Sequence, residues 1–302
     1  MIVCFGSINA DLVFDVDQAP ASGQTVLARR LRLEAGGKGA NQAVAAARDG
    51  ASVVMVGAVG DDPMRPVALQ GLAACGADIS RLKTTRQPTG CASILVDSQG
   101  HNQIVVAPGA NGDASADQVD PPLLARASLL LLQMECAPQA IQAVLARAHA
   151  AGVRVILNLA PAVELPAEVL RQCALLVVNE SEAQSLAGWL DCGDSARALN
   201  QRLGVDVLRT LGAAGAEAAT VEGDCFVPAH PVLVVDTTAA GDSFVGVLAA
   251  ALDSGLPLLA AMRRASAAAA LTCSRRGSQS SLPLQTEIDA LLDARPPARQ
   301  PA

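Results

Sequence analysis

The chain has few aromatic residues, and their scarcity excludes some functions. Among its 302 residues there is no tyrosine, one tryptophan and four phenylalanines. Proteins that bind single-stranded nucleic acid need aromatic side chains on which the bases stack. Basic runs are also missing and the net charge is −7, whereas nucleic-acid phosphates require clustered Lys and Arg. The sequence therefore predicts no nucleic-acid partner.

Long apolar runs are missing as well. Hydrophobic residues make up 51% of the chain, but no uncharged apolar run reaches the roughly 18 to 20 residues that span a bilayer. Residues 2–5 form a short apolar run with no basic segment before it and no cleavage site after it, so no signal peptide is indicated. We expect a cytoplasmic protein with no membrane partner. The eight cysteines are scattered without a C-x-x-C pair, which is typical of reduced packing residues.

Two common nucleotide-binding motifs do not occur. No G-x-G-x-x-G follows the first apolar run, and no acid follows it at the spacing of a dinucleotide-binding fold. Gly37-Lys38 lies in no G-x-x-x-x-G-K-[ST] frame, which excludes a P-loop kinase or GTPase. A dinucleotide-dependent oxidoreductase is also disfavoured.

Apolar segments of strand and helix type alternate along the chain. A length of 302 residues favours one large domain over two equal ones. Helical spacing separates many of the strand-like runs, and such alternation predicts an α/β fold whose parallel sheet is covered on both faces. The predicted strands are 2–5, 52–59, 128–134, 154–159, 175–178, 207–211 and 232–235. The predicted helices are 39–49, 138–150, 182–187, 195–203, 242–254 and 258–274.

The segment 235–244, Val-Asp-Thr-Thr-Ala-Ala-Gly-Asp-Ser-Phe, carries the most chemical information. Small residues at 239–241 let backbone N–H groups converge at a helix start, where the helix dipole favours an anion. Asp242 at the edge of such a site is a candidate general base for phosphoryl transfer to a hydroxyl. The alternative is an ordinary acid in a first helical turn.

Two further segments near the N-terminus combine glycines with amides and acids. They are 6–11, Gly-Ser-Ile-Asn-Ala-Asp, and 36–42, Gly-Gly-Lys-Gly-Ala-Asn-Gln. A polyol needs fixed hydrogen-bonding groups and glycines that allow close approach of the backbone, and Asn9, Asp11 and Asn41 meet that need. Each of them is also a common turn residue, but their combination favours a binding site.

With these three segments the chain resembles the ribokinase branch of the PfkB-type carbohydrate kinases over about residues 2–293. The two N-terminal segments look like the family's sugar-binding signature, and 236–242 looks like its anion-hole and catalytic signature. The resemblance implies a three-layer αβα sandwich over 1–293 with a small β-sheet lid formed by about 10–35 and 88–107. It also implies ATP with Mg²⁺, activation by a monovalent cation such as K⁺, and a homodimer through the lid. Residues 294–302 have no apolar face and are expected to be disordered.

The resemblance assigns roles to individual residues. Asp242 is the expected base, with an anion hole formed by Ala239, Ala240 and Gly241. The expected sugar contacts are Asn9, Ala10, Asp11, Gly37, Lys38, Gly39, Ala40, Asn41, Glu135 and Asp242. The expected nucleotide contacts are Asn179, Thr210, Leu211, Gly212, Ala213, Ala214, Gly215, Gly241, Asp242 and Ser266. Glu182 is expected to hold Mg²⁺ largely through water. The expected monovalent-cation residues are Asp236, Thr238, Thr272, Arg275, Gly277 and Ser281.

Several of these residues also have a structural interpretation. Glu135 and Glu182 are acids near helix starts, and Lys38 is a phosphate contact or a solvated lysine. Arg275 and Gly277 also suit a helix C-terminus. The chain departs from the family pattern at Gln24, at Ser266 beside the expected adenine, and in the cation loop 278–281, Ser-Gln-Ser-Ser. Ala239 stands where the wider family has glycine.

The implied activity is transfer of the ATP γ-phosphoryl group to the 5-hydroxyl of D-ribose. Alternatives within the class are 2-deoxyribose, a hexose or a nucleoside such as adenosine, although a nucleoside base usually stacks on an aromatic side chain and few are available. A sugar-binding protein without catalysis is the alternative of a different class. It would be expected to have lost the base or the anion hole, and both are present.

Overall fold

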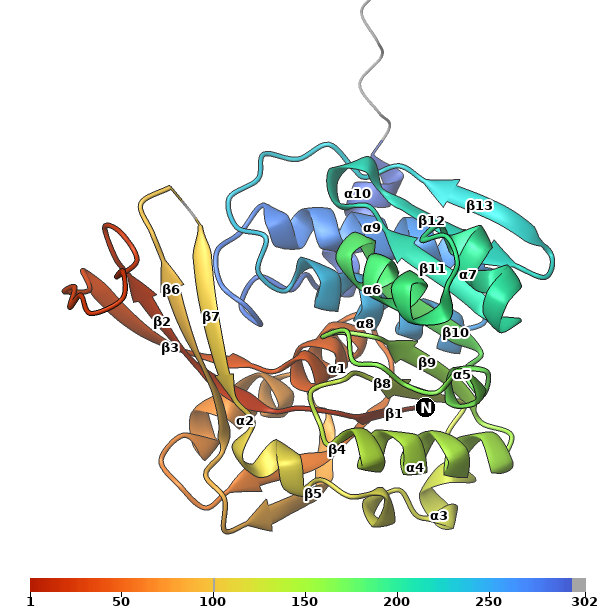
Figure 1. Ribbon diagram of the computed structural model, residues 1–302, viewed down its shortest axis with the longest axis horizontal. Coiled ribbons are helices and arrows are strands. Elements are labelled where there is room, and N and C mark those ends of the chain that lie inside the picture. Colours follow the sequence, from red (N-terminus) through yellow and green to blue (C-terminus); the bar gives the residue numbers. More distant parts are fainter. Residues whose placement is uncertain (100, 295–302) are drawn as a thin grey trace, which may run out of the picture.

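The computed structural model describes residues 1–99 and 101–294 and contains a large and a small β-sheet (Figure 1). Nine strands form the large sheet in the order β13-β12-β11-β10-β9-β8-β1-β4-β5. Neighbours pair in parallel except at β11–β12 and β12–β13, which are antiparallel. The strands are β1 Ile2–Phe5, β4 Val53–Gly60, β5 Asp78–Thr85, β8 Leu129–Leu132, β9 Arg154–Asn158, β10 Leu175–Asn179, β11 Asp206–Thr210, β12 Ala216–Thr220 and β13 Gly223–Val227.

Helices cover both faces of this sheet, and its central strands are buried throughout. In β1, Ile2 and Cys4 face one apolar core, while Val3 and Phe5 face the other, as the two-residue period of a strand requires. The first core contains α1 Lys38–Arg48, α2 Arg65–Ala74, α8 Ala240–Asp253, α9 Leu258–Cys273 and α10 Gln285–Asp293. The second contains α3 Pro121–Leu124, α4 Pro138–Ala150, α5 Ala167–Leu170, α6 Glu180–Leu190 and α7 Ala196–Leu203. Short 3-10 turns are η1 Gly109–Asp113, η2 Ala116–Gln118 and η3 Gly212–Ala214. The expected α/β fold with a mainly parallel sheet is confirmed.

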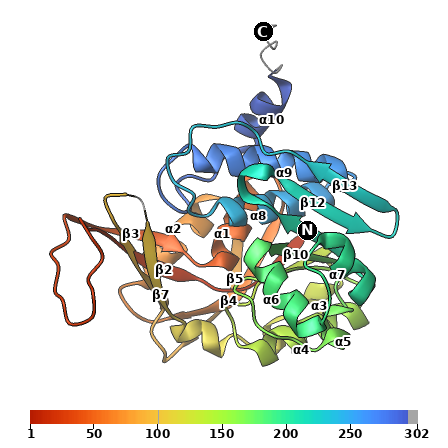
Figure 2. The same ribbon diagram turned by 45° about the horizontal axis from the view of Figure 1, so that its top comes forward.

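The small sheet projects from one side of the molecule (Figure 1 and Figure 2). Its order is β3-β2-β6-β7, with β2 and β6 parallel and the outer pairs antiparallel. The strands are β2 Asn9–Asp15, β3 Arg30–Gly36, β6 Gly90–Val96 and β7 Asn102–Ala107. They come from the two regions, 10–35 and 88–107, in which the strand–helix alternation breaks.

The expected strand at 232–235 is wrong. The segment is unpaired in either sheet, and Leu233 is 84% exposed. The N–H group of Val235 donates instead to the C=O of Cys273 at 2.8 Å. Apolar composition suggested a buried strand, but the segment only connects the edge strand β13 to α8. The strand β5 and helix α2 were not expected, since β5 is largely polar and only two residues of α2 are buried.

Among the described residues no helix is long and apolar enough to cross a membrane. The expectation of a disordered tail falls almost entirely on residues 295–302, outside the described ranges.

Close packing of α1 against α8 brings the N-terminal ends of both helices together. A Cβ atom at Gly246 of α8 would lie 2.4 Å from the backbone oxygen of Gln42 and 2.6 Å from the Cβ of Ala45. No real Cβ atom tolerates such contacts, so only glycine permits this helix separation. Asp242, one turn before Gly246, thereby reaches the side chains of α1.

Replacement of Gly246 by valine is therefore expected to push α8 away from α1. Overpacking of this kind destabilises folded proteins by about 1–3 kcal/mol, which denaturant unfolding would measure. Gly188→Ala in α6 is the matched control, because a Cβ there meets no atom within 4 Å and alanine favours a helix. Equal unfolding free energies for Gly246→Val and the wild type would contradict the tight contact.

Candidate active site

The candidate site lies at the carboxyl ends of the parallel strands, where open α/β sheets bind ligands. Asn179 ends β10 and Thr210 ends β11, while Glu135 follows β8 by three residues. The N-terminal ends of α1 and α8 lie at the same edge. The structure thus gathers residues from five segments far apart in the sequence.

Asp242 is held by two amides from α1. Its Oδ2 accepts a hydrogen bond from Nδ2 of Asn41 at 2.9 Å, and its Oδ1 accepts one from Nε2 of Gln42 at 3.0 Å. Only 8% of Asp242 is exposed. A carboxylate so fixed, with its remaining lone pairs free, suits a general base.

The start of α8 leaves backbone N–H groups available beside this carboxylate. Ser243 donates the first i→i−4 bond of the helix, to Ala239 at 2.8 Å, so the N–H groups of Gly241 and Asp242 precede the helical ladder. Ala240 donates to the C=O of Thr237 at 3.2 Å. Ala239 has φ 59° and ψ 8°, a left-handed conformation that a non-glycine residue adopts at a cost of about 1–3 kcal/mol. Ala239, Gly241 and Asp242 of this strained turn line a cavity, and N–H groups so arranged suit an anion.

A cavity of about 220 Å³ opens next to the turn. Lys38, Asn179, Glu182, Thr210 and Asp242 are among the residues that line it. The Asp242 carboxylate raises the pKa of Lys38 against the opposing effect of burial, and Glu135 and Glu182 add to the rise. Lys38 is therefore a fixed positive charge in this cavity.

Asn179 and Glu182 form a capping box at the start of α6. The Oδ1 of Asn179 accepts from the Glu182 N–H at 2.8 Å, and Oε2 of Glu182 accepts from the Asn179 N–H at 2.8 Å. The structural interpretation of this motif is thus correct, but it leaves Oε1 of Glu182 outside the box. Burial raises the pKa of Glu182, and a metal ion there would offset that burial. No cluster of three or more His, Cys, Asp or Glu that could hold a metal occurs within 1–99 and 101–294, so this donor set suits a largely hydrated Mg²⁺.

Several of the expected sugar-binding residues lie near Asp242 and one another, since the carboxylates of Glu135 and Asp242 act on the pKa of Asp11. Oδ1 of Asn9 accepts from Nδ2 of Asn111 at 2.8 Å, and Oε2 of Glu135 accepts from the Ser7 hydroxyl at 2.6 Å and the Lys38 N–H at 3.0 Å. Asp11 is 7% exposed, and its Oδ1 has no hydrogen-bond partner among the described residues. Such a buried acceptor suits a ligand hydroxyl.

The glycines and alanines of the sugar motif shape the backbone. Gly37 has φ 87°, and a Cβ there would lie 2.9 Å from both the Asn9 nitrogen and the Ser7 oxygen. Gly39 packs against Gly6 equally closely. Ala10 and Ala40 are fully buried. These four residues allow close approach of backbone segments and present no polar side chain.

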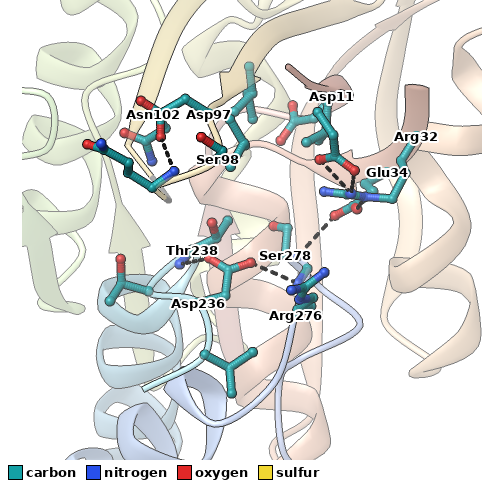
Figure 3. A pocket seen from close by; sticks show the side chains of 18 of the residues that line it. Asp11, Arg32, Glu34, Asp97, Ser98, Asn102, Asp236, Thr238, Arg276 and Ser278 are labelled. Carbon is teal, nitrogen blue, oxygen red and sulfur yellow. Dashed lines mark hydrogen bonds and ion pairs between the residues drawn. The ribbon is translucent and has the colours of Figure 1, made fainter. Parts of the chain in front are cut away.

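A second cavity, of about 620 Å³, separates the small sheet from the loops before α8 and after α9 (Figure 3). On the sheet side, Arg32 pairs with Asp15 at 2.7 Å and with Glu34 at 2.9 Å. Glu34 in turn accepts from the Ser278 N–H at 3.2 Å. The small sheet therefore contacts the C-terminal loop directly across this cavity.

The expected monovalent-cation residues, which would contribute mostly main-chain oxygens, have side chains with partners of their own. Asp236 accepts from the N–H groups of Thr238 at 2.9 Å and Gly277 at 3.1 Å. Although burial raises the pKa of Asp236, these hydrogen bonds hold it below its ordinary value. Three of the other side chains also form polar contacts. Thr272 donates to Ser243 at 2.8 Å, Arg275 pairs with Glu287, and Ser281 donates to Ser278 O at 2.7 Å.

The expected nucleotide residues are more dispersed. Thr210 lines the smaller cavity, and Leu211 and Gly215 flank the exposed turn of residues 212–214, formed by Gly212, Ala213 and Ala214. Ser266 lies on α9, where its hydroxyl donates to Pro228 O at 3.3 Å, and it lines neither cavity.

Sequence reasoning missed a group of buried amides around the site: Gln42, Asn111, Gln133, Asn158 and Gln279. Gln42 lies within the quoted motif and a helical projection beside Asn41 would have suggested it. The other four follow no local pattern, because their partners are distant in the sequence.

Comparisons with known proteins agree with this geometry. A sequence model of the pfkB family of carbohydrate kinases matches residues 1–285. The chain is 36% identical over 294 residues to the ribokinase of Bacillus subtilis, covering 96% of this chain and 99% of that protein. It is 35% identical over 306 residues to the ribokinase of Schizosaccharomyces pombe, covering 95% and 96%. A deoxyribokinase of Salmonella typhi is 34% identical over 292 residues, covering 93% and 95%.

Solved structures show the same fold. The ribokinase of Thermotoga maritima superposes with a TM-score of 0.90 at 31% identity, covering 97% of this chain and 99% of that one. The Arabidopsis thaliana ribokinase complexed with ribose and ATP gives a TM-score of 0.87 at 30% identity, with the same coverage. The expected family is confirmed.

The buried Asp11 predicts a pH-dependent stability. Burial raises its pKa from 3.8 to about 7, and the carboxylates of Glu135, Glu34 and Asp242 add to the rise. Between these values the native protein retains a proton that the unfolded chain has released, so wild-type stability falls as pH rises. Asn has no such charge. The free energy of unfolding of Asp11→Asn, relative to that of the wild type, should therefore increase from about pH 4 to pH 7 and stay constant above pH 7. The increase is at most about 1.4 kcal/mol for each unit by which folding shifts the pKa.

Thermal unfolding at pH 5 and pH 8 measures this difference. Asp61→Asn, at a carboxylate whose side chain is 89% exposed, is the matched control. An Asp11→Asn gain that is equal at both pH values would show that Asp11 does not titrate there.

Proposed function

The chain belongs to the pfkB family of carbohydrate kinases, and we propose that it transfers the γ-phosphoryl group of ATP to the 5-hydroxyl of D-ribose, giving D-ribose 5-phosphate and ADP. The observation that carries this proposal is the position of Asp242. Its carboxylate adjoins the N–H groups at the start of its helix and is held by two amides, one of which, Asn41, belongs to the proposed sugar pocket. A base and an anion site in contact are what phosphoryl transfer to a hydroxyl requires.

The sugar is proposed to bind among Asn9, Asp11, Asn41 and Glu135. These side chains offer carboxylate and amide groups to the hydroxyls of a polyol, and the free acceptor of Asp11 is available to one of them. With the sugar there, Asp242 accepts the proton of the 5-hydroxyl as its oxygen attacks the γ-phosphorus. The relative solved with ribose and ATP supports this pair of substrates.

The triphosphate is proposed to lie in the smaller cavity. Lys38 and the N–H groups of Gly241 and Asp242 are the donors that face its charge. Glu182 would hold Mg²⁺ through water, and the ion would neutralise phosphate charge. Thr210 and the turn at 212–214 would contact the rest of the nucleotide.

A monovalent cation is proposed to bind behind the anion site. Asp236 is a half-buried carboxylate between the two loops that flank it, and the N–H groups of Thr238 and Gly277 already fix its orientation. Carbonyl oxygens of the same loops complete a donor set that suits K⁺. Its role would be to hold the loop before Ala239 in place.

2-Deoxyribose is the second candidate acceptor. The deoxyribokinase of Salmonella typhi is 34% identical to this chain, close to the values for the ribokinases, so overall identity does not separate the two sugars. The two sugars differ by a single hydroxyl. Discrimination between them depends on details of the pocket.

The small sheet is proposed to act as a lid and to pair with a second copy of the chain. The register places Leu12, Leu31, Leu33 and Val105 on one face, while Asp11, Arg32 and Glu34 on the opposite face line the large cavity. Leu31 is 51%, Leu33 50% and Val105 71% exposed. A largely apolar sheet face, interrupted by Ser93 and directed away from the protein's own cavity, suits a self-complementary interface.

Leu33→Glu is therefore expected to shift the protein from dimer to monomer, because a carboxylate in an apolar symmetric contact meets its own copy. Light scattering of the eluted protein gives the mass. Leu233→Glu, at a position that is 84% exposed outside the small sheet, serves as the control. A wild-type monomer, or a dimer unaffected by Leu33→Glu, would exclude this interface.

The activity is tested by ATP turnover with D-ribose, 2-deoxy-D-ribose, D-fructose and adenosine, each with Mg²⁺ and with or without K⁺. We expect turnover to be highest on ribose and to increase with K⁺. Asp242→Asn should fold normally and lose about 10²- to 10⁴-fold in kcat. Preference for another acceptor would change the assigned sugar. Near-native kcat in Asp242→Asn would show that Asp242 is not the general base. No turnover on any acceptor would favour a non-catalytic sugar-binding protein.

A further inference from the structure

Two chains of buried amides converge on Asp242, one from each side of the carboxylate. The first runs from Gln133 after β8 through Gln42 of α1. Nε2 of Gln133 donates to Oε1 of Gln42 at 2.7 Å, and Nε2 of Gln42 donates to Oδ1 of Asp242 at 3.0 Å. Gln133 and Gln42 are fully buried.

The second chain runs from Gln279, in the loop after α9, through Asn41. Nε2 of Gln279 donates to Oδ1 of Asn41 at 3.1 Å, and Nδ2 of Asn41 donates to Oδ2 of Asp242 at 2.9 Å. Asn41 is 6% and Gln279 4% exposed. The Ser278 hydroxyl also approaches Oδ1 of Asn41, at 3.4 Å.

We propose that these four amides form a relay, polarised by the carboxylate, that orients Asp242 for catalysis, with Gln133 and Gln279 as remote positioning residues. The proposal rests on the role of Asp242 in the proposed function. An ionised carboxylate only accepts hydrogen bonds, so Gln42 and Asn41 must both turn their nitrogens toward it. Their oxygens then point outward and require donors, which fixes Gln133 and Gln279 in turn.

Asn158 supports the direction of the first chain independently. Its Nδ2 donates to the backbone oxygen of Val177 at 3.2 Å, which turns its Oδ1 toward Nε2 of Gln42 at 2.9 Å. Gln42 therefore faces two acceptors, Asn158 and Asp242, and can present only its nitrogen to both. The amide orientation follows from these partners.

Both chains end in a buried oxygen without a donor. Oε1 of Gln133 and Oε1 of Gln279 have no hydrogen-bond partner among the described residues. Each packs where only glycine leaves room, because a Cβ at Gly6 would clash with the first and a Cβ at Gly71 with the second. An unsatisfied buried acceptor costs about 1–3 kcal/mol. These two unsatisfied oxygens indicate that Asp242 sets the orientation of each amide in turn, and that this arrangement lowers the free energy of unfolding.

The relay explains how one carboxylate stays aligned. Each oxygen of Asp242 receives one N–H group, which defines the carboxylate plane and leaves its other lone pairs for the substrate hydroxyl. Such preorganisation matters because a misplacement of about 1 Å can lower the rate about 100-fold. The chains come from opposite sides, so the carboxylate cannot rotate without breaking one of them.

Reversal of the outermost amide tests the relay. Gln279→Glu and Gln133→Glu replace a donor by an ionised acceptor of nearly the same shape. The oxygen of Asn41 or Gln42 then faces an acceptor, which disfavours the amide orientation that directs a nitrogen at Asp242. We expect kcat for ribose to fall about 10- to 100-fold with less than about a twofold change in the KM for ATP. Gln279→Met and Gln133→Met change the shape more but reverse no amide, and are expected to lower kcat less than the Glu variants.

Shape alone predicts that Met is more harmful than the isosteric Glu, and the cost of introducing a carboxylate, which is separate from shape, is assessed by a Glu substitution away from the site. Gln118→Glu is the matched control, because Gln118 also donates to two oxygens, of Gly57 and Arg81, away from the site. Full kcat in the Glu variants, greater loss in the Met variants, or an equal loss in Gln118→Glu would overturn the relay.

A thermal measurement is independent of any activity. Gln279→Glu should lower Tm at least about twice as much in the wild type as in Asp242→Asn, where residue 242 can accept or donate. Equal Tm shifts in the two backgrounds would overturn the relay even if the enzyme is active. Unequal shifts in a protein that phosphorylates no acceptor would support the relay and refute only the proposed function.

Discussion

The contact between the N-terminal ends of α1 and α8 is the constraint on which the rest of the site depends. Gly246 lets the helices approach until a single added methyl group would clash with the backbone of α1. At this separation the two amides of Asn41 and Gln42 reach both oxygens of Asp242. The same approach places the helix N–H groups of α8 beside Lys38 of α1, so base, anion site and counter-charge arise from one packing contact.

Electrostatics explains the surroundings of this contact. Glu135, Glu182 and Asp242 lie near Lys38, Asp11 lies near Glu135 and Asp242, and burial raises the pKa of Asp11 and Glu182. Carboxylates suit a neutral polyol because they accept from its hydroxyls, but they repel a polyphosphate. The anionic substrate is therefore proposed to lie on the opposite side of Asp242, toward helix N–H groups, Lys38 and a divalent cation. Separation of the two substrates by the base itself follows from this distribution of charge.

Much of the fold was predictable because its signals are local. Apolar runs such as 2–5 and helical spacing such as 138–150 appear in the structure as β1 and α4, and turns with polar alternation marked the small sheet. The prediction failed where composition and burial diverge. The apolar segment 232–235 is exposed and unpaired, whereas α2 buries only two of its residues and gave too weak a signal.

The sequence by itself determined which groups the site can use: a carboxylate after small residues at a helix start, glycines where backbone segments meet, and amides in the N-terminal motif. These are properties of short segments, and their spacing alone supports phosphoryl transfer to a polyol. Tertiary structure alone decided which amides face Asp242 and in which direction. Gln279 and Asn41 are 238 residues apart, and Gln133 and Gln42 are 91 apart. An amide side chain has no preferred end until a partner selects one, and those partners meet only when the chain has folded.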